Sequence, residues 1–283
     1  MGGCTDVTLA KTAGFCFGVK RAVDMVYKES EENKEVYTFG PIIHNEEVVS
    51  SLEKRGVSVI NNEDELKELK RGTIIIRSHG VQRYIYDIAK NNGLSIVDAT
   101  CPFVKNIHKI VDEYSSNGYQ IVIIGSDNHP EVEGIKGWCK SKVYVIDSVE
   151  DVKELSIFND KICVVSQTTF NHKLYEDIID KIKSIFNDAY IVNTICNATQ
   201  ERQEEAILLA KDSDVMIVIG GKHSSNTQKL YKICEKECSN TFYIQKSSDL
   251  ELDKISSDAK IGITAGASTP NNIIKEVFDQ CQK

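Results

Sequence analysis

The chain has 283 residues, which is long enough for two or three domains that each bury a core of their own. Its formal net charge is −8 and it has no basic run, so we do not expect nucleic acid as a partner. No apolar stretch of about 18 residues and no leader pattern occurs, and the odd count of nine cysteines does not suggest a disulfide framework, so we expect a cytoplasmic protein with no membrane span.

Short apolar runs rich in β-branched residues alternate with helix-length amphipathic segments along the chain, which is typical of α/β units on parallel sheets. The predicted strands are 7–10, 36–39, 57–60, 73–78, 94–99, 121–125, 142–146, 162–166, 189–194, 216–220, 241–244 and 261–265. The clearest predicted helices are 18–33, 176–188 and 198–213, where apolar residues recur every three or four positions.

A threefold internal repeat is indicated by cysteine, glycine and histidine positions. Each of three cysteines stands 24 residues before a glycine that closes an apolar run, and a histidine follows each glycine within four residues. The cysteines are Cys16, Cys101 and Cys196, the glycines are Gly40, Gly125 and Gly220, and the histidines are His44, His129 and His223. The chain has only six histidines, so this agreement favours a repeat over coincidence.

The repeat predicts three α/β domains, 17–101, 102–196 and 197–283, each with a mostly parallel four-stranded sheet. The third domain has one predicted strand too few. A strand precedes Cys16 just as strands precede Cys101 and Cys196, so we expect the strand in 1–16 to complete the third domain. Such closure favours a pseudo-threefold trefoil with a shared site at its centre.

Three unpaired cysteines delivered by equivalent segments are suited to an iron-sulfur cluster with one iron left open, because thiolates are soft ligands. Two alternatives remain open, namely buried structural cysteines and a zinc site of cysteine and histidine. The other six cysteines are expected to have no part in the cluster, and most of them to pack in cores: Cys4, Cys139, Cys163, Cys234, Cys238 and Cys281.

Five polar turns each follow a predicted strand: 40–45, 77–81, 128–134, 222–230 and 265–272. The carboxyl ends of parallel strands are where ligands bind, and backbone N–H groups at helix starts attract anions. The turns therefore predict an anion pocket suited to phosphate, although any single serine in them could be an ordinary helix cap. We expect His108 and His172 to be ordinary surface histidines.

Glu131 is the carboxylate best placed for proton transfer, because it lies two residues from His129 on one of these turns. Thr168, in the segment SQTT, has a hydroxyl that could relay a proton. A threonine at a strand end is also common for purely structural reasons.

Nine ordered segments together resemble the 4-hydroxy-3-methylbut-2-enyl diphosphate reductase family. They are AGFCFGVKRAV, GPIIHN, RSHGV, DATCPFV, NHPEVEG, SQTT, NTICNATQERQ, SSNT and AGASTP, and they run from Cys16 to Pro270. The resemblance implies a 4Fe-4S cluster, one per chain, held by Cys16, Cys101 and Cys196 at the centre of the trefoil, with a three-iron form where the exposed iron is lost. It implies diphosphate binding by His44, His79, His129, Thr168, Ser224, Ser225, Asn226 and Ser268, and proton supply by Glu131 with help from Thr168.

The implied reaction, the last of the methylerythritol phosphate isoprenoid route, removes the hydroxyl of the allylic diphosphate as water, using two electrons and protons. Protonation at either end of the allyl group gives isopentenyl or dimethylallyl diphosphate. The sequence has no dinucleotide fingerprint, since Gly220 and Gly221 alone do not make one, so the resemblance implies an external donor, ferredoxin or flavodoxin.

Two alternatives to this function remain open. Quinolinate synthase also places one cysteine from each of three domains around an open-iron cluster, but it is a condensing dehydratase that needs no electrons. A noncatalytic iron-sulfur sensor is the other alternative. The segments NHPEVEG and SSNT favour the reductase, and retained Glu131 speaks against a sensor.

Overall fold

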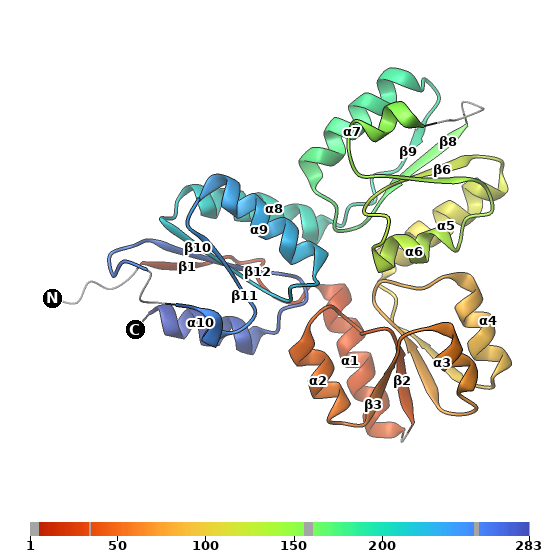
Figure 1. The fold of residues 1–283 in the computed structure, drawn as a ribbon, viewed down its shortest axis with the longest axis horizontal. Helices are drawn as coiled ribbons and strands as arrows, with labels where there is room; N and C mark the ends of the chain where they lie inside the picture. Colours follow the sequence, from red (N-terminus) through yellow and green to blue (C-terminus); the bar gives the residue numbers. More distant parts are fainter. Residues whose placement is uncertain (1–5, 34, 156–160, 252–254, 283) are drawn as a thin grey trace. The chain divides into compact units, whose positions relative to one another are not determined.

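The computed structural model describes residues 6–33, 35–155, 161–251 and 255–282. These residues contain three four-stranded sheets, and all neighbouring strands in them are parallel (Figure 1). The predicted α/β class with three parallel sheets is therefore confirmed. Cys4 lies outside the described residues.

The strands of each sheet are given in their spatial order. The first sheet contains β3 (Val57–Ile60), β2 (Val36–Phe39), β4 (Thr73–Ile76) and β5 (Ser95–Asp98). The second contains β7 (Val143–Ile146), β6 (Gln120–Ile124), β8 (Ile162–Ser166) and β9 (Tyr190–Ile191). The third contains β11 (Thr241–Ile244), β10 (Val215–Ile219), β12 (Ile261–Ala265) and β1 (Val7–Leu9).

Helices connect these strands. Those around the first sheet are α1 (Phe17–Glu32), α2 (Glu46–Glu53), α3 (Glu63–Glu68) and α4 (Arg83–Asn91). Those around the second are α5 (Pro102–Ser116), α6 (Pro130–Lys136), the short η1 (Asp151–Glu154) and α7 (His172–Ile185). The third sheet has α8 (Asn197–Lys211), α9 (Ser225–Glu237), the short η2 (Ser247–Asp249) and α10 (Asn271–Cys281).

The three sheets share one topology once β1 is counted with the third. Strand β1 pairs with β12, with Val7 opposite Ile261, and so occupies the place that β5 and β9 occupy in the other two sheets. This is the pairing that the sequence predicts for the N-terminal strand. The domain boundaries at residues 101 and 196 and the trefoil arrangement stay predictions.

By its internal packing the chain divides into two compact units. Unit 1 comprises Met1–Lys20, His44–Val48 and Asn197–Lys283, and it contains the third sheet. Unit 2 comprises Arg21–Ile43 and Val49–Cys196, and it contains the first and second sheets. Each is described by itself below.

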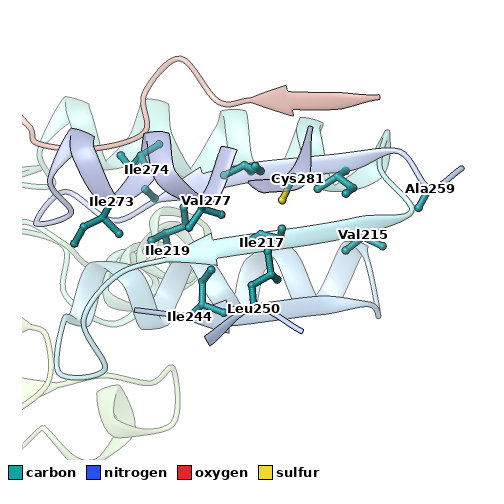
Figure 2. Close-up of a cluster of buried hydrophobic side chains, with 13 residues drawn as sticks. Val215, Ile217, Ile219, Ile244, Leu250, Ala259, Ile273, Ile274, Val277 and Cys281 are labelled. Atoms are coloured by element: carbon teal, nitrogen blue, oxygen red, sulfur yellow. The ribbon is translucent and has the colours of Figure 1, made fainter. Parts of the chain in front are cut away.

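Central strands are buried on both faces, which explains their continuous apolar sequences. Every residue of β4, β6, β8, β10 and β12 is buried. In unit 1, α8 and α9 cover one face of the third sheet and α10 covers the other (Figure 1). Ile273, Ile274 and Val277 of α10 pack with Ile217 and Ile219 of β10 (Figure 2).

Strand β9 is shorter than the predicted strand 189–194, because a side chain takes over from the backbone ladder. The Thr194 hydroxyl accepts a hydrogen bond from Ser166 N and donates one to Ser166 O, both at 2.7 Å. Together with the hydrogen bond from Val192 N to Val164 O (2.9 Å), these contacts hold the chain against β8 beyond the end of β9. Among the described residues, no helix is long and apolar enough to cross a membrane.

Candidate active site

Cys16, Cys101 and Cys196 occupy equivalent positions at the carboxyl edges of their sheets. Each follows an edge strand of its sheet, β1, β5 or β9, and each directly precedes a helix, α1, α5 or α8. Each backbone N–H donates to a turn after a neighbouring strand: Cys16 to Ala267 O (3.4 Å), Cys101 to Ser78 O (2.9 Å) and Cys196 to Thr168 O (3.0 Å). The repeat thus extends to the hydrogen bonds that hold the cysteines.

The three cysteines fit a thiolate-bound metal cluster better than the other described cysteines do. They are half-buried at helix starts, where a soft metal can reach the sulfur. Burial raises the pKa of the Cys163 and Cys234 thiols to about 12, and that of Cys281 to about 11. Burial also raises the pKa of half-buried Cys139 to about 12. These four thiols stay protonated, as the prediction of core packing requires.

Glu131 is held in unit 2 by Thr168. It lies in the first turn of α6 and is 1% exposed. Its Oε1 accepts from Thr168 N at 2.5 Å, and its Oε2 accepts from Thr168 Oγ1 at 2.7 Å. Since the carbonyl of the same threonine accepts from Cys196 N, one residue links the carboxyl group to a cysteine.

His129 is the N-cap of α6, and its Nδ1 accepts from Glu131 N at 3.1 Å. In a neutral imidazole the proton then lies on Nε2, which becomes a hydrogen-bond donor. The ring of His79, from the turn after β4, lies edge-on to the His129 ring with centroids 5.6 Å apart. Unit 2 therefore brings together His79, His129, Glu131 and Thr168.

In unit 1, hydroxyl groups gather at the start of α9. Ser224 is the N-cap, and its Oγ accepts from Thr227 N (3.4 Å) and Thr227 Oγ1 (2.9 Å). Ser268 Oγ lies 3.2 Å from His44 O and 3.4 Å from Ser224 Oγ. The structure thus brings together Ser224, Ser268 and the segment of His44.

Asn226 and Ser225 occupy the first turn of α9, beside this group. Asn226 is 6% exposed, and its Nδ2 has no hydrogen-bond partner among the described residues. Ser225 is half-buried. A buried amide donor at a helix start is suited to an anion, because the unbonded helical N–H groups attract negative charge at the same place. His223, which marks the repeat in the sequence, is exposed.

The expectation for His108 is wrong. This residue is 3% exposed, and its ring stacks on Trp138 with centroids 5.0 Å apart. Burial lowers the pKa of His108 to about 4, so the imidazole is neutral. The helical spacing from Val104 and to Val111, both buried, was the available indication.

Two buried threonines in these turns were not predicted as site residues. Thr227 is fully buried and bonds to Ser224, and Thr269 is fully buried and donates to Ile219 O at 3.0 Å. The close approach of Thr227 to Gly220 and Gly266 leaves no room for a side chain at either glycine. Both threonines lie in the segments SSNT and AGASTP that already carried the resemblance.

Comparisons with known proteins agree on one family. The profile of the family described as LytB protein matches residues 7–282, which is nearly the whole chain. This chain belongs to the LytB family. Its curated relatives include the 4-hydroxy-3-methylbut-2-enyl diphosphate reductases of Caldanaerobacter subterraneus subsp. tengcongensis (50% identity, covering 97% of this chain and 96% of the relative) and Clostridioides difficile (47%, covering 96% and 97%).

Solved structures give the same result for the LytB fold. A structure of (E)-4-hydroxy-3-methyl-but-2-enyl diphosphate reductase, described as the terminal enzyme of the non-mevalonate pathway, has 40% identity and a TM-score of 0.72, and the match covers 98% of this chain and 99% of that one. The Plasmodium falciparum reductase has 28% identity and a TM-score of 0.93, with coverage of 99% and 89%. Nothing in these comparisons favours quinolinate synthase.

Proposed function

We propose that this LytB-family chain is a 4-hydroxy-3-methylbut-2-enyl diphosphate reductase, which converts its substrate to isopentenyl and dimethylallyl diphosphate with two electrons. Family membership supports this reaction. The observation that carries the proposal is the pair Glu131 and Thr168. A buried carboxyl group is held at both oxygens by a residue whose carbonyl accepts from Cys196 N.

Cys16, Cys101 and Cys196 would hold an iron-sulfur cluster, and we propose the 4Fe-4S type with one iron that has no protein ligand. Loss of that iron would give a three-iron form. Support comes from three equivalent half-buried thiols at helix starts. When bound, the cluster supplies single electrons and a Lewis-acidic iron.

We propose that eight residues bind the diphosphate: His44, His79, His129, Thr168, Ser224, Ser225, Asn226 and Ser268. Two features support the assignment: the free amide donor of Asn226 at the start of α9, and the Nε2 donor that the cap geometry gives His129. Neutral donors and helix N-termini can bind a highly charged anion through hydrogen bonds and the helix dipole, without cationic side chains in the site.

Glu131 would deliver protons to the departing hydroxyl and then to the allyl group. Its two hydrogen bonds fix the direction of the carboxyl group, so little reorganisation is needed at the moment of transfer. The Thr168 hydroxyl would relay the proton to Glu131, since it can donate and accept at once. Water leaves as the second product.

Electrons would come from an external one-electron donor, ferredoxin or flavodoxin, because no nicotinamide or flavin motif is present in the sequence. We place the enzyme in the cytoplasm, where a reducing environment keeps the thiol ligands available. The sequence lacks a basic run for nucleic acid.

The test is turnover of 4-hydroxy-3-methylbut-2-enyl diphosphate by anaerobically purified protein with reduced viologen. We expect substrate-dependent dye oxidation and both five-carbon diphosphates as products, from protein that carries about four irons and four sulfides. A colourless protein with stoichiometric zinc after reconstitution, or no dye oxidation by protein that holds the cluster, would contradict the proposal.

A further inference from the structure

In two places, the helix that follows one candidate cysteine ligand carries an arginine that binds the backbone just before another cysteine. Helix α8 begins directly after Cys196, and its Arg202 is 3% exposed. Arg202 Nη2 donates to Gly14 O at 2.9 Å, and Nη1 donates to Ala265 O at 2.5 Å. Gly14 stands two residues before Cys16.

The same helix holds this segment at a second point. Glu205, one turn beyond Arg202, accepts from Lys11 N (2.8 Å), Thr12 N (2.9 Å) and Thr12 Oγ1 (2.6 Å). These hydrogen bonds lower the pKa of Glu205 although its partial burial acts in the opposite direction, so the carboxylate is charged at neutral pH. The segment 11–14 is thus held by one cation and one anion.

Gly14 makes the segment dependent on these contacts. Its φ is +99°, a conformation that other residues rarely adopt, and a Cβ there would lie 2.7 Å from Asn271 Oδ1. Backbone hydrogen bonds flank the turn, from Ala13 N to Ala10 O (3.2 Å) and from Cys16 N to Ala267 O (3.4 Å). The side chains of α8 supply the bonds to Lys11, Thr12 and Gly14 between them, and so help to set the path of the chain towards Cys16.

An equivalent arrangement exists in unit 2. Helix α1 begins directly after Cys16, and its Arg21 is half-buried. Arg21 Nη1 donates to Thr100 O (3.2 Å) and Ala99 O (3.5 Å), and Nη2 donates to Asp98 O (3.5 Å). These three carbonyls belong to the residues immediately before Cys101.

Resting on the proposed cluster, we propose that Arg202 and Arg21 are positioning residues for the cysteine ligands: Arg202, with Glu205, for Cys16, and Arg21 for Cys101. A guanidinium group suits this task because it is always charged and its planar fork can reach two carbonyls at once. The backbone before Cys16 and before Cys101 would then be positioned by side chains outside the set that we assign to substrate binding.

Alkylation of the cluster-free protein tests the proposal by a readout other than activity. Limiting iodoacetamide is added, and the rate at each cysteine is followed by peptide mass spectrometry. Arg202→Met should raise the rate at Cys16 by about tenfold and leave Cys101 unchanged, while Arg21→Met should do the reverse. A tenfold change is what loss of one charge-assisted hydrogen bond produces.

Matched variants separate positioning from general loosening. Glu204→Gln on α8 and Lys28→Met on α1 change exposed residues of the same helices and should leave both rates unchanged. Arg202→Lys should restore part of the protection. If Arg202→Met does not fold, the alkylation rate at Cys16 is measured in Glu205→Gln and Thr12→Val instead. If Arg21→Met does not fold, the rate at Cys101 is measured in Arg21→Lys.

Cluster-loaded protein provides the second measurement. Arg202→Met and Arg21→Met should lose iron to a chelator about 10- to 100-fold faster than wild type, the range found when residues behind metal ligands are changed. They should also shift the midpoint potential and the electron paramagnetic resonance spectrum. Unchanged alkylation rates, or equal rises at Cys16 and Cys101, would overturn the inference. Absence of an iron-sulfur cluster in wild type would instead contradict the proposed function.

Discussion

The turn from β6 to α6 and the turn from β10 to α9 are equivalent in topology but differ in chemistry. Each leaves the same strand position of its sheet and ends in a side chain that caps the next helix, His129 in one and Ser224 in the other. The first then places a buried carboxyl group, Glu131, in the helix, whereas the second has hydroxyl and amide groups. Under the proposed function, one backbone arrangement would thus serve proton transfer with anion binding in one unit, and anion binding alone in the other.

This difference has a simple electrostatic reason. A carboxylate among the groups that bind a diphosphate would repel it, whereas neutral donors at a helix start attract it. Conversely, hydroxyl groups alone have no proton to give at neutral pH. In the proposed function, the turn before α6 combines the carboxyl group with His129, whereas the turn before α9 has neutral donors alone. The following experiments examine this difference.

The largest effect is expected from Glu131→Gln. The amide keeps the size of the side chain but cannot supply a proton, so kcat should fall by about 10²- to 10⁴-fold while the cluster spectrum stays intact. Viologen-linked assays and absorption spectra measure the two quantities. Glu133→Gln, in the same helix but paired with Lys136 at 2.7 Å, is the matched control and should stay near wild type. A near-normal rate for Glu131→Gln would assign proton transfer elsewhere.

We expect acid to destabilise the region around α6 most, because the buried side chain of His108 packs there. Burial holds the pKa of His108 at about 4 in the folded protein, against about 6.5 when unfolded. The unfolded chain therefore binds more protons between these values, and stability is lost as pH falls from 6.5 towards 4. The loss attributable to this residue is about 3 kcal/mol.

Urea unfolding at pH 7 and pH 4.5 measures this contribution. His108→Gln should lose much of the pH dependence, whereas His172→Gln on α7 should retain it. Equal pH dependence in His108→Gln and wild type would show that another group causes the acid sensitivity.

A smaller effect is expected from Thr168→Val, which removes the hydroxyl bond to Glu131 Oε2 and keeps the backbone bond to Oε1. Loss of one such bond corresponds to about a tenfold decrease in kcat. Thr168→Ser keeps the hydroxyl and should retain most activity. If Thr168→Ser is as slow as the valine variant, the methyl group rather than the hydroxyl matters.

The smallest effect is expected from Ser224→Ala on the anion-binding side. Removing the cap of α9 should reduce the unfolding free energy by about 1 kcal/mol and raise KM severalfold, with kcat close to wild type. Ser184→Ala, which removes a hydroxyl bonded only to a helix carbonyl of α7, should not change KM. A fall in kcat without a change in KM would place Ser224 in the chemical step instead.

Sequence alone predicted the strands well because the central strands are buried on both faces and therefore uniformly apolar. The strand predicted at 189–194 was too long. The Thr194 hydroxyl takes the place of backbone pairing there, and in the sequence this threonine cannot be told from any other β-branched strand residue. The surface position that was expected for His108 was wrong as well. Polar residues are rare on buried helix faces, and here the ring is buried because it stacks on Trp138.

For the candidate site, the repeat was sufficient to locate the cysteines and the capping turns, because both follow strand ends. The contacts of Arg202 and Arg21 could not be predicted in this way. They join side chains to carbonyls that are 63 to 188 positions distant in the chain, and a backbone carbonyl is the same in every type of residue. Such hydrogen bonds can be recognised only once the fold shows which helix lies beside which loop.

The pairing of β1 with β12 also sets an order of events during synthesis. The first two sheets use strands between residues 36 and 191, so they can form while the ribosome is still adding the rest of the chain. Residues 7–9 must wait for 261–263, and the backbone of Cys16 must wait for Ala267. Closing so long a loop is slow, and the waiting strand has unpaired edges. One of the three thiols therefore reaches its place only after residues 261–267 have been synthesised, and a cofactor that needs all three must be inserted afterwards.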